Sequence, residues 1–425
     1  MADATWAGPN VLPVREQARV VNDILLRRFE TLLPQIMRET AIDCWLIVCH
    51  EDNHDPVFRT MIPWQSWTPI LQIQVFFDPG NELPIERINL SMTNMRGLME
   101  KAEWTPESAS DQWNLLRRMM DDRRPERIGI NTSDTIWAAD GLTAALKERL
   151  IKEIGADHAA KLTSAEGLCI RWLETRLPEE LQQYDNACAI GRHIIATCFS
   201  QDTITPGVTT TEDLVWAYWQ LASDQGLPPS FTPYFRIFRS PADTDHNPTD
   251  DLVIRHGDML HCDVGVNYLR LITDHQELAY ILRPDETEAP AGLREGMEES
   301  NRLQDIFTSA WSLGSSGNEI LSDALARAHE SGIRGPKIYS HSLGHCLHEP
   351  GPLMGLPWEQ GNIPGRGDVI MHPNTVYTVE LSTELQVPEW DDQPVRFMLE
   401  QDAAITESGV TYLAGRQTTF HLIQH

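Results

Sequence analysis

The sequence lacks any uncharged run of the length that a transmembrane helix needs. Its first residues, MADATWAGPNVLPVREQ, also lack the basic start and the apolar stretch that mark a signal peptide. We therefore expect no transmembrane helix, no membrane partner and a cytoplasmic location.

Basic residues are scarce, because 34 lysines and arginines stand against 62 aspartates and glutamates. The formal net charge is −28. A chain with this charge repels the phosphate backbone of nucleic acids. We therefore expect no nucleic-acid partner.

Paired cysteines are also missing. The seven cysteines are odd in number, scattered, and never spaced as CxxC. This pattern argues against a disulfide framework and predicts reduced thiols. The residues are Cys44, Cys49, Cys169, Cys188, Cys198, Cys262 and Cys346.

With 425 residues, of which 41% are hydrophobic, the chain is too long for one small domain and long enough for two. In its first third, helical periodicity alternates with short apolar runs such as CWLIVCH at 44–50. This alternation predicts an α/β domain over residues 1–170. The other predicted strands are 70–78, 85–91 and 127–132, and the predicted helices are 15–40, 109–121 and 140–154.

The patterns in residues 171–425 predict a second domain. A helix begins at Pro178, with two glutamates in its first turn, where the helix dipole favours acidic side chains. The letters TTTE at 209–212 form a capping-box pattern that opens a second helix. A helix, a turn, a second helix and then strands are thus predicted twice in succession. This repetition suggests a duplicated half, and the separate runs of helices and strands suggest an α+β fold class. The later predicted elements are strands within 251–282, helices at 289–312 and 319–330, and strands within 337–425.

Two pairs of acidic residues flank predicted turns. Asp263 and Asp274 are equidistant from a loop at 267–270, and an antiparallel hairpin would place them directly opposite each other. Glu380 and Glu400 are likewise equidistant from a later turn, in the apolar contexts YTVEL and FMLEQ. Like charges directly opposite each other destabilise a sheet, and a buried carboxylate tends to protonate. Any one of the four fits a solvent-facing strand position, but two symmetric pairs indicate cations between them.

Three histidines, His341, His345 and His348, lie close together in YSHSLGHCLHEPG. Four carboxylates and one imidazole balance the charge of two divalent metal ions. Oxygen-rich ligation favours Mn²⁺, with Co²⁺, Zn²⁺ or Fe²⁺ as alternatives. Two neighbouring metal ions lower the pKa of a shared water and polarise a carbonyl group. The sequence therefore predicts hydrolysis of an amide-like bond.

The order of these residues is an aspartate, ten residues, a second aspartate, and then a histidine and two glutamates. It resembles the M24 metallopeptidase family, which includes methionine aminopeptidase, Xaa-Pro aminopeptidase and prolidase, with creatinase as a metal-free relative. The resemblance covers about 175–425 and implies the pita-bread fold, with a curved antiparallel sheet around the site. It also implies a creatinase/prolidase-type N-terminal α/β domain and a homodimer.

The resemblance implies a role for each predicted ligand. Asp263 would chelate one metal ion, whereas His345 and Glu380 would hold the other. Asp274 and Glu400 would bridge both ions. Glu380 would also carry the proton from the nucleophilic water to the leaving amine.

The resemblance implies three further active-site histidines. His246 would bind substrate, His348 would steady the tetrahedral intermediate, and His341 matches a histidine four residues before the metal ligand. Three departures from the family pattern stand out. Only two residues separate His345 from His348 where the family has six, HQELAY follows the second aspartate, and Met398 stands where arginine is common.

These features support three hypotheses for the function. The leading one is a dinuclear metallohydrolase of a C–N bond, an Xaa-Pro aminopeptidase or dipeptidase that uses a metal-bridging hydroxide on a small peptide or amide-like substrate. The alternative is a non-peptidase C–N hydrolase of a small metabolite, as in the creatinase and ectoine-hydrolase branches. The third is an inactive binding module, against which the complete set of ligands argues.

Overall fold

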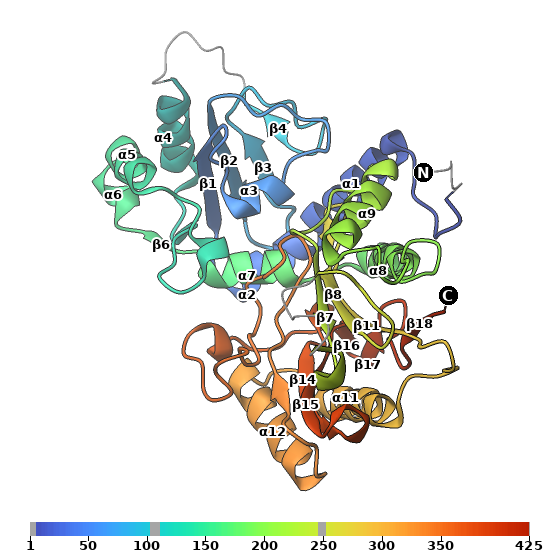
Figure 1. Cartoon of the computed structure of the whole chain (residues 1–425). Coiled ribbons are helices and arrows are strands. Elements are labelled where there is room, and N and C mark those ends of the chain that lie inside the picture. Colours follow the sequence, from blue (N-terminus) through green and yellow to red (C-terminus); the bar gives the residue numbers. More distant parts are fainter. Residues whose placement is uncertain (1–5, 103–110, 245–251, 425) are drawn as a thin grey trace. The chain divides into compact units, whose positions relative to one another are not determined.

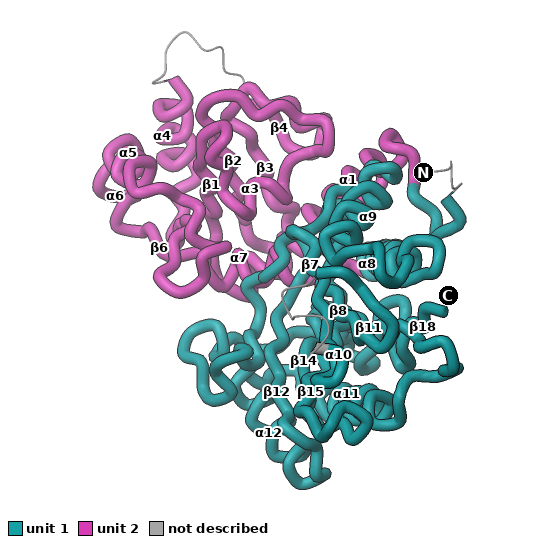
Figure 2. Tube along the Cα trace, viewed as in Figure 1, with its two compact units in different colours: residues 1–11, 178–425 teal, residues 12–177 magenta. Residues whose placement is uncertain are grey.

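A computed structural model describes residues 6–102, 111–244 and 252–424 (Figure 1). The chain divides into two compact units, Leu12–Leu177 and the rest of the described residues (Figure 2). The boundary expected at residue 170 falls inside α7 (Glu166–Glu174), the last helix of the first unit.

The first unit contains, within the described residues, a six-stranded sheet in the order β4-β3-β2-β1-β5-β6. Its central strand β1 (Cys44–His50) is buried along all but its last residue, as expected for the apolar run CWLIVCH. The strand pairs antiparallel with β2 (Leu71–Phe77) and parallel with β5 (Ile128–Ile130). The remaining strands are β3 (Glu86–Asn89), β4 (Glu100–Lys101) and β6 (Leu162–Ser164).

The helices of this unit follow the predicted helical patterns. The pattern at 15–40 forms α1 (Val14–Arg27) and α2 (Leu33–Glu39), joined by one π-helical turn. Apolar side chains of α4 (Asp111–Arg123) and α5 (Ala144–Ile154) join the sheet residues in one hydrophobic core. The shorter helices are α3 (Pro56–Thr60) and α6 (Ala156–Ala159), with a 3₁₀ turn at Trp137–Ala139.

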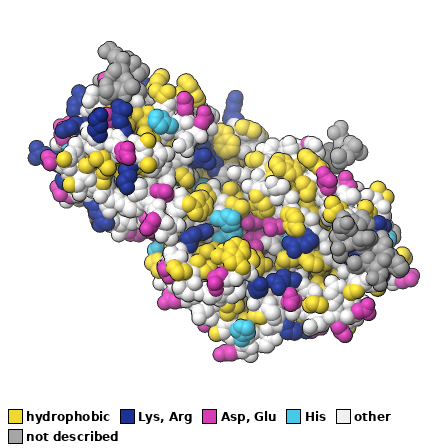
Figure 3. All heavy atoms as spheres, turned by 60° about the vertical axis from the view of Figure 1, so that its left-hand side comes forward, with side chains coloured by type: hydrophobic (Ala, Val, Ile, Leu, Met, Phe, Trp, Pro, Cys, Tyr) yellow, Lys and Arg dark blue, Asp and Glu magenta, His cyan; other side chains and the backbone are white. Residues whose placement is uncertain are grey.

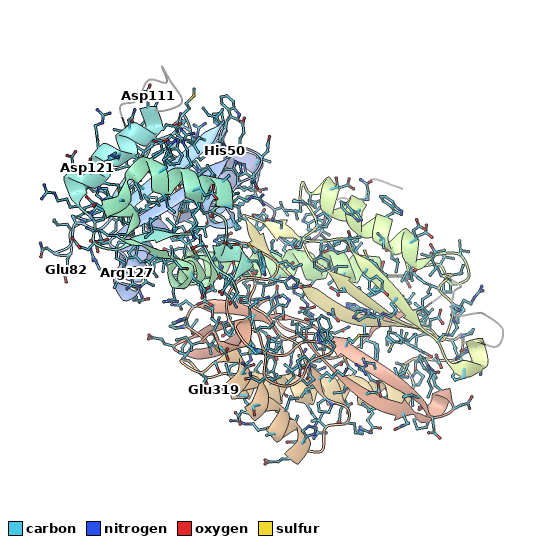
Figure 4. The ribbon with its side chains drawn as sticks, turned by 90° about the vertical axis from the view of Figure 1, so that its left-hand side faces the viewer. His50, Glu82, Asp111, Asp121, Arg127 and Glu319 are labelled. Carbon is cyan, nitrogen blue, oxygen red and sulfur yellow. The ribbon has the colours of Figure 1, made fainter. Side chains whose placement is uncertain are left out.

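The second unit is built from two helix pairs, each followed by strands (Figure 1). In the first pair, α8 (Pro178–Cys198) begins at its proline, and a capping box between Thr210 and Asp213 opens α9 (Thr211–Asp224). In the second pair, α11 (Ala291–Ala310) packs on the strands that follow, and α12 (Gly317–Glu330) packs on α11. Glu319, labelled in Figure 4, closes the capping box of α12 with Ser316.

Among the described residues, the strands of the second unit form three main sheets, in the orders β18-β11-β8-β7, β12-β14-β15 and β13-β16-β17. The first sheet contains β7 (Tyr234–Phe238), β8 (Met259–Val264), β11 (His275–Ile281) and β18 (His421–Ile423). The second contains β12 (Lys337–Ile338), β14 (Leu381–Val387) and β15 (Gln393–Leu399). The third contains β13 (Thr375–Thr378), β16 (Asp402–Thr406) and β17 (Gly409–Tyr412). The other elements are α10 (Pro241–Thr244), the ribbon β9 (Asn267–Tyr268) and β10 (Leu271–Ile272), and 3₁₀ turns at Arg366–Asp368 and Pro388–Trp390.

The hairpin that carries Asp263 differs from the prediction in its register. Asp263 lies opposite Gln276 and not directly opposite Asp274. The chain turns at Leu269 and Arg270, whose φ angles of 55° and 65° are left-handed, so the turn is centred one residue later than expected. No glycine or asparagine marks these two positions, which is why the sequence does not show where this turn lies.

The second hairpin has the expected register. Strands β14 and β15 pair Leu381 with Leu399 as the last pair of their ladder, and Glu380 and Glu400 are the residues directly beyond that pair on the two strands. Glu400 also forms a main-chain bridge with Gln276, in which each residue's N–H donates to the other's carbonyl at 3.1 Å. This bridge joins the second hairpin to β11 of the first.

A buried ion pair fixes the start of β8. Arg239 Nε and Nη2 each donate to one carboxylate oxygen of Asp258 at 2.7 Å, and both side chains are buried. We expect Arg239→Met to lower the free energy of unfolding by about 3–5 kcal/mol, because it leaves the buried carboxylate of Asp258 without its cationic partner. Denaturant unfolding measures this loss. The matched control is Arg327→Met, which breaks an exposed pair with Asp323 and should cost about 1 kcal/mol or less.

None of the helices in the described part of the chain combines the length and the apolar character that crossing a membrane requires.

Candidate metal centre

Four carboxylates reach the site from strand ends of the second unit. Asp263 lies near the end of β8, and Asp274 directly precedes β11. Glu380 directly precedes β14, and Glu400 directly follows β15. Asp274 and Glu400 are buried, whereas Asp263 and Glu380 are partly exposed to solvent. The site therefore has a buried side and a side that solvent reaches.

The buried side is completed by His341. Its Nε2 lies 3.7 Å from Oδ2 of Asp274 and 3.9 Å from Oε1 of Glu400. Its Nδ1 lies 3.1 Å from the carbonyl oxygen of Ser342, which can only accept a hydrogen bond. The ring N–H therefore belongs to Nδ1, and the lone pair of Nε2 faces two carboxylates. With both carboxyl groups ionised, this arrangement is repulsive unless a cation lies between the three groups.

His345 lies elsewhere, although the sequence analysis placed it among the ligands. Its Nδ1 is 3.1 Å from the carbonyl oxygen of Arg270, and its Nε2 is 3.7 Å from Oε1 of Glu180 on α8. The imidazole thus faces α8, whereas His341 is the histidine that lies beside Asp274 and Glu400. The sequence contains a signal for this position. The family typically has six residues between the metal-binding histidine and the later histidine, and six residues likewise separate His341 from His348.

The remaining predicted histidines have different positions. The ring of His348 contacts that of His341 edge to face, with the centroids 4.5 Å apart, and His348 is exposed. Partial burial and the nearby Arg366 lower the pKa of His348, so its imidazole is neutral at pH 7. His246 lies outside the described residues.

Gln276 is a site residue that the sequence analysis noted only as part of HQELAY. Its Nε2 donates to Oε1 of Glu380 at 2.6 Å and to Oε2 of Glu400 at 2.8 Å. Its Oε1 accepts a hydrogen bond from Nε2 of the buried His261 at 2.9 Å. The amide therefore holds both glutamates in place, and only the observed register, with Gln276 opposite Asp263, reveals it.

The carboxylates are electrostatically costly without a cation. Burial raises the pKa of Asp274, Glu380 and Glu400 well above the usual range, and repulsion between neighbouring carboxylates raises each further. Burial also raises the pKa of Asp263, to about 6, and lowers that of His341 to about 3. On the surface, Figure 3 shows acidic and basic side chains interspersed over the face in view.

The donor set fits divalent cations. Oδ1 of Asp274 and Oε1 of Glu400 are buried and have no hydrogen-bond partner among the described residues. One ligand atom each from Asp274, His341 and Glu400 lies within 4.8 Å of the others. Four carboxylates and a neutral imidazole supply four negative charges, which two divalent ions would neutralise.

We expect Gln276→Ala to weaken metal binding about 10–100-fold, because the amide orients two ligands without being one. Isothermal titration of metal-free protein with Mn²⁺ measures the change. Gln386→Ala, on the exposed face of β14, is the control and should bind the ion like the wild type. Equal affinities in both variants would contradict a positioning role for Gln276.

Comparisons with known proteins identify the family of this chain. The model of metallopeptidase family M24 matches residues 182–407, more than half of the chain. No curated protein matches the sequence.

Solved structures share the fold at low sequence identity. The X-Pro aminopeptidase from Thermotoga maritima MSB8 is 16% identical with a TM-score of 0.64, over 92% of this chain and 100% of that one. The Xaa-Pro dipeptidase from Bacillus anthracis is 15% identical with a TM-score of 0.60, over 96% and 99%. The prolidase from Pyrococcus horikoshii OT3 is 16% identical with a TM-score of 0.56, over 95% and 99%. The fold is thus α+β and of the pita-bread type, and the family match shows that this chain belongs to metallopeptidase family M24.

Proposed function

We propose that this protein hydrolyses a C–N bond with two divalent metal ions, and that its substrates are small peptides with proline after the scissile bond. The observation that carries the proposal is the buried cluster of His341, Asp274 and Glu400, in which one ligand atom of each residue lies within 4.8 Å of the others. Asp263 and Glu380 would complete the ligand set on the side that solvent reaches. When bound, the ions would lower the pKa of a water molecule and polarise the scissile carbonyl.

Side chains of the protein would transfer the proton and stabilise the reacting substrate. Glu380 is partly exposed and is held by Gln276, so its carboxylate can take a proton from water and pass it to the leaving amine. His348 is exposed beside His341 and is neutral at pH 7, so one ring nitrogen can donate to a developing oxyanion. A substrate-binding role for His246 stays a proposal from the sequence.

We expect chelation to abolish the activity and Mn²⁺ to restore it. The assay uses Xaa-Pro dipeptides and, separately, longer peptides with proline in the second position, which distinguishes a dipeptidase from an aminopeptidase. Xaa-Ala dipeptides are the matched control for proline specificity. Protein that binds two ions and cleaves none of these peptides would contradict the peptidase assignment.

A second candidate is hydrolysis of a C–N bond in a small metabolite. The observation that favours it concerns the strand before Glu400, where Met398 lies opposite Ser382. Arg396, the nearest arginine on this strand, pairs with the exposed Glu384 at 2.8 Å. The arginine that prolidase-like relatives carry next to the site therefore has no substitute on β15. Cleavage of cyclic or N-alkyl amides but not of peptides would support this candidate.

We further propose a homodimer located in the cytoplasm, as the resemblance and the sequence suggest. Light scattering coupled to size-exclusion chromatography tests the assembly. A mass of one chain at micromolar concentration would contradict the dimer.

A further inference from the structure

A second buried group of potential ligands lies beside the metal centre and shares no residue with it. Cys188 comes from α8, His275 is the first residue of β11, and Asp402 is the first residue of β16. One ligand atom from each lies within 4.8 Å of the other two, and all three side chains are fully buried.

The hydrogen bonds of this group are incomplete. Cys188 Sγ donates to Oδ2 of Asp402 at 3.3 Å, and the main-chain N–H of Asp274 donates to the same oxygen at 3.3 Å. Oδ1 of Asp402 and both ring nitrogens of His275 have no partner among the described residues. A buried polar group left unpaired is destabilising, because it has lost its hydrogen bonds to water. The imidazole of His275 and Oδ1 of Asp402 therefore lack a bonding partner among the described residues.

We propose that Cys188, His275 and Asp402 bind a further divalent cation, of the zinc class, that is separate from the metal centre. Sulfur, imidazole nitrogen and carboxylate oxygen form a donor set typical of Zn²⁺, at distances of about 2.0–2.3 Å. The 3.3 Å between Sγ of Cys188 and Oδ2 of Asp402 suits two ligands on one such ion. A thiolate and a carboxylate would neutralise its two charges, and the cation itself deprotonates a coordinating thiol.

A catalytic role for this group is disfavoured by its burial. Cys188 is fully buried, and burial together with Asp402 raises the pKa of its thiol far above the usual range. The thiol is therefore neither accessible to a substrate nor reactive as a nucleophile without a metal. A cation here would instead cross-link α8, β11 and β16. Because the main-chain N–H of Asp274 donates to Asp402, the cross-link would also help to hold the backbone at Asp274.

The test uses the full chain, stripped of metal and titrated with Co²⁺. A thiolate bound to Co²⁺ gives a sulfur-to-metal charge-transfer band in the near ultraviolet, whereas the metal centre offers only oxygen and imidazole donors. We expect the wild type to show the band. Cys188→Ala should lose the band and should bind one cobalt ion fewer per chain than the wild type. Cys198→Ala is the matched control, because Cys198 is buried on the same helix, and this variant should keep the band.

The proposal is independent of the function proposed above, because the band should survive His341→Ala, which removes a ligand of the metal centre alone. If Cys188→Ala does not fold, Cys188→Ser keeps the size of the side chain and should lose the band in the same way. The absence of the band from wild-type protein that binds Co²⁺ would overturn the proposal. So would a band that persists in folded Cys188→Ala or Cys188→Ser.

Discussion

Asp274→Ala is expected to abolish hydrolysis and to lower the metal content of the protein. Oδ2 of Asp274 faces Nε2 of His341, and its Oδ1 has no other partner among the described residues, so both oxygens are available to cations. Metal ions contribute several kcal/mol to stabilising charge in the transition state, and each 1.36 kcal/mol is tenfold in rate. We therefore expect a loss in kcat/KM of at least about a hundredfold.

This variant should still fold, because the hydrogen bond from Asp274 to Asp402 uses the main-chain N–H, which alanine retains. Near-ultraviolet circular dichroism verifies the fold, and mass spectrometry of the purified protein measures the metal content. Asp285→Ala, at an exposed position after β11, is the control and should leave both readouts unchanged. Full activity of Asp274→Ala with a normal metal content would remove the basis for the proposed site.

His341→Ala and His345→Ala are expected to give opposite results, although the two histidines are four residues apart. His341→Ala removes the only imidazole that faces Asp274 and Glu400 among the described residues. We expect a lower metal content and a loss of activity of at least about a hundredfold. His345→Ala should keep both metal ions, because its ring faces Glu180 and the carbonyl of Arg270.

Metal analysis and steady-state assays of both variants in parallel distinguish the observed geometry from the assignment that the sequence suggested. Each variant is the matched control of the other, since both remove one imidazole from the same loop. Loss of metal in His345→Ala with full retention in His341→Ala would restore the sequence-based assignment.

Much of the fold could be predicted because local signals agree with tertiary packing. Strand β1 matches the predicted 44–50, since an apolar run of this length fits a buried strand and is too short for a helix. The helix start at Pro178 follows from an N-terminal proline. The start at Thr211 follows from a capping box, which joins Thr210 to Asp213 and so ends one residue beyond the predicted pattern at 209–212. These signals depend only on neighbours in the chain.

The arrangement of the metal centre could be predicted only in part. The pair Glu380 and Glu400 follows from the symmetry of its hairpin about the turn, whereas the Asp263 hairpin is shifted by an unmarked turn at Leu269 and Arg270. The histidine that faces the carboxylates is decided by loop geometry, and so the choice between His341 and His345 needs the structure. A hydrogen-bonding partner such as Gln276 likewise becomes visible only when the strands are aligned.

The bridge between Gln276 and Glu400 has a consequence for how the protein is made. The two residues lie 124 positions apart, so Gln276 is synthesised well before Glu400. A growing polypeptide on the ribosome thus carries Asp263 and Asp274 long before it can enclose them. Since Glu380 and Glu400 follow later in the chain, a nascent copy that has not yet reached them lacks two of the four proposed carboxylate ligands, and we expect it to be unable to hydrolyse the nascent proteins around it.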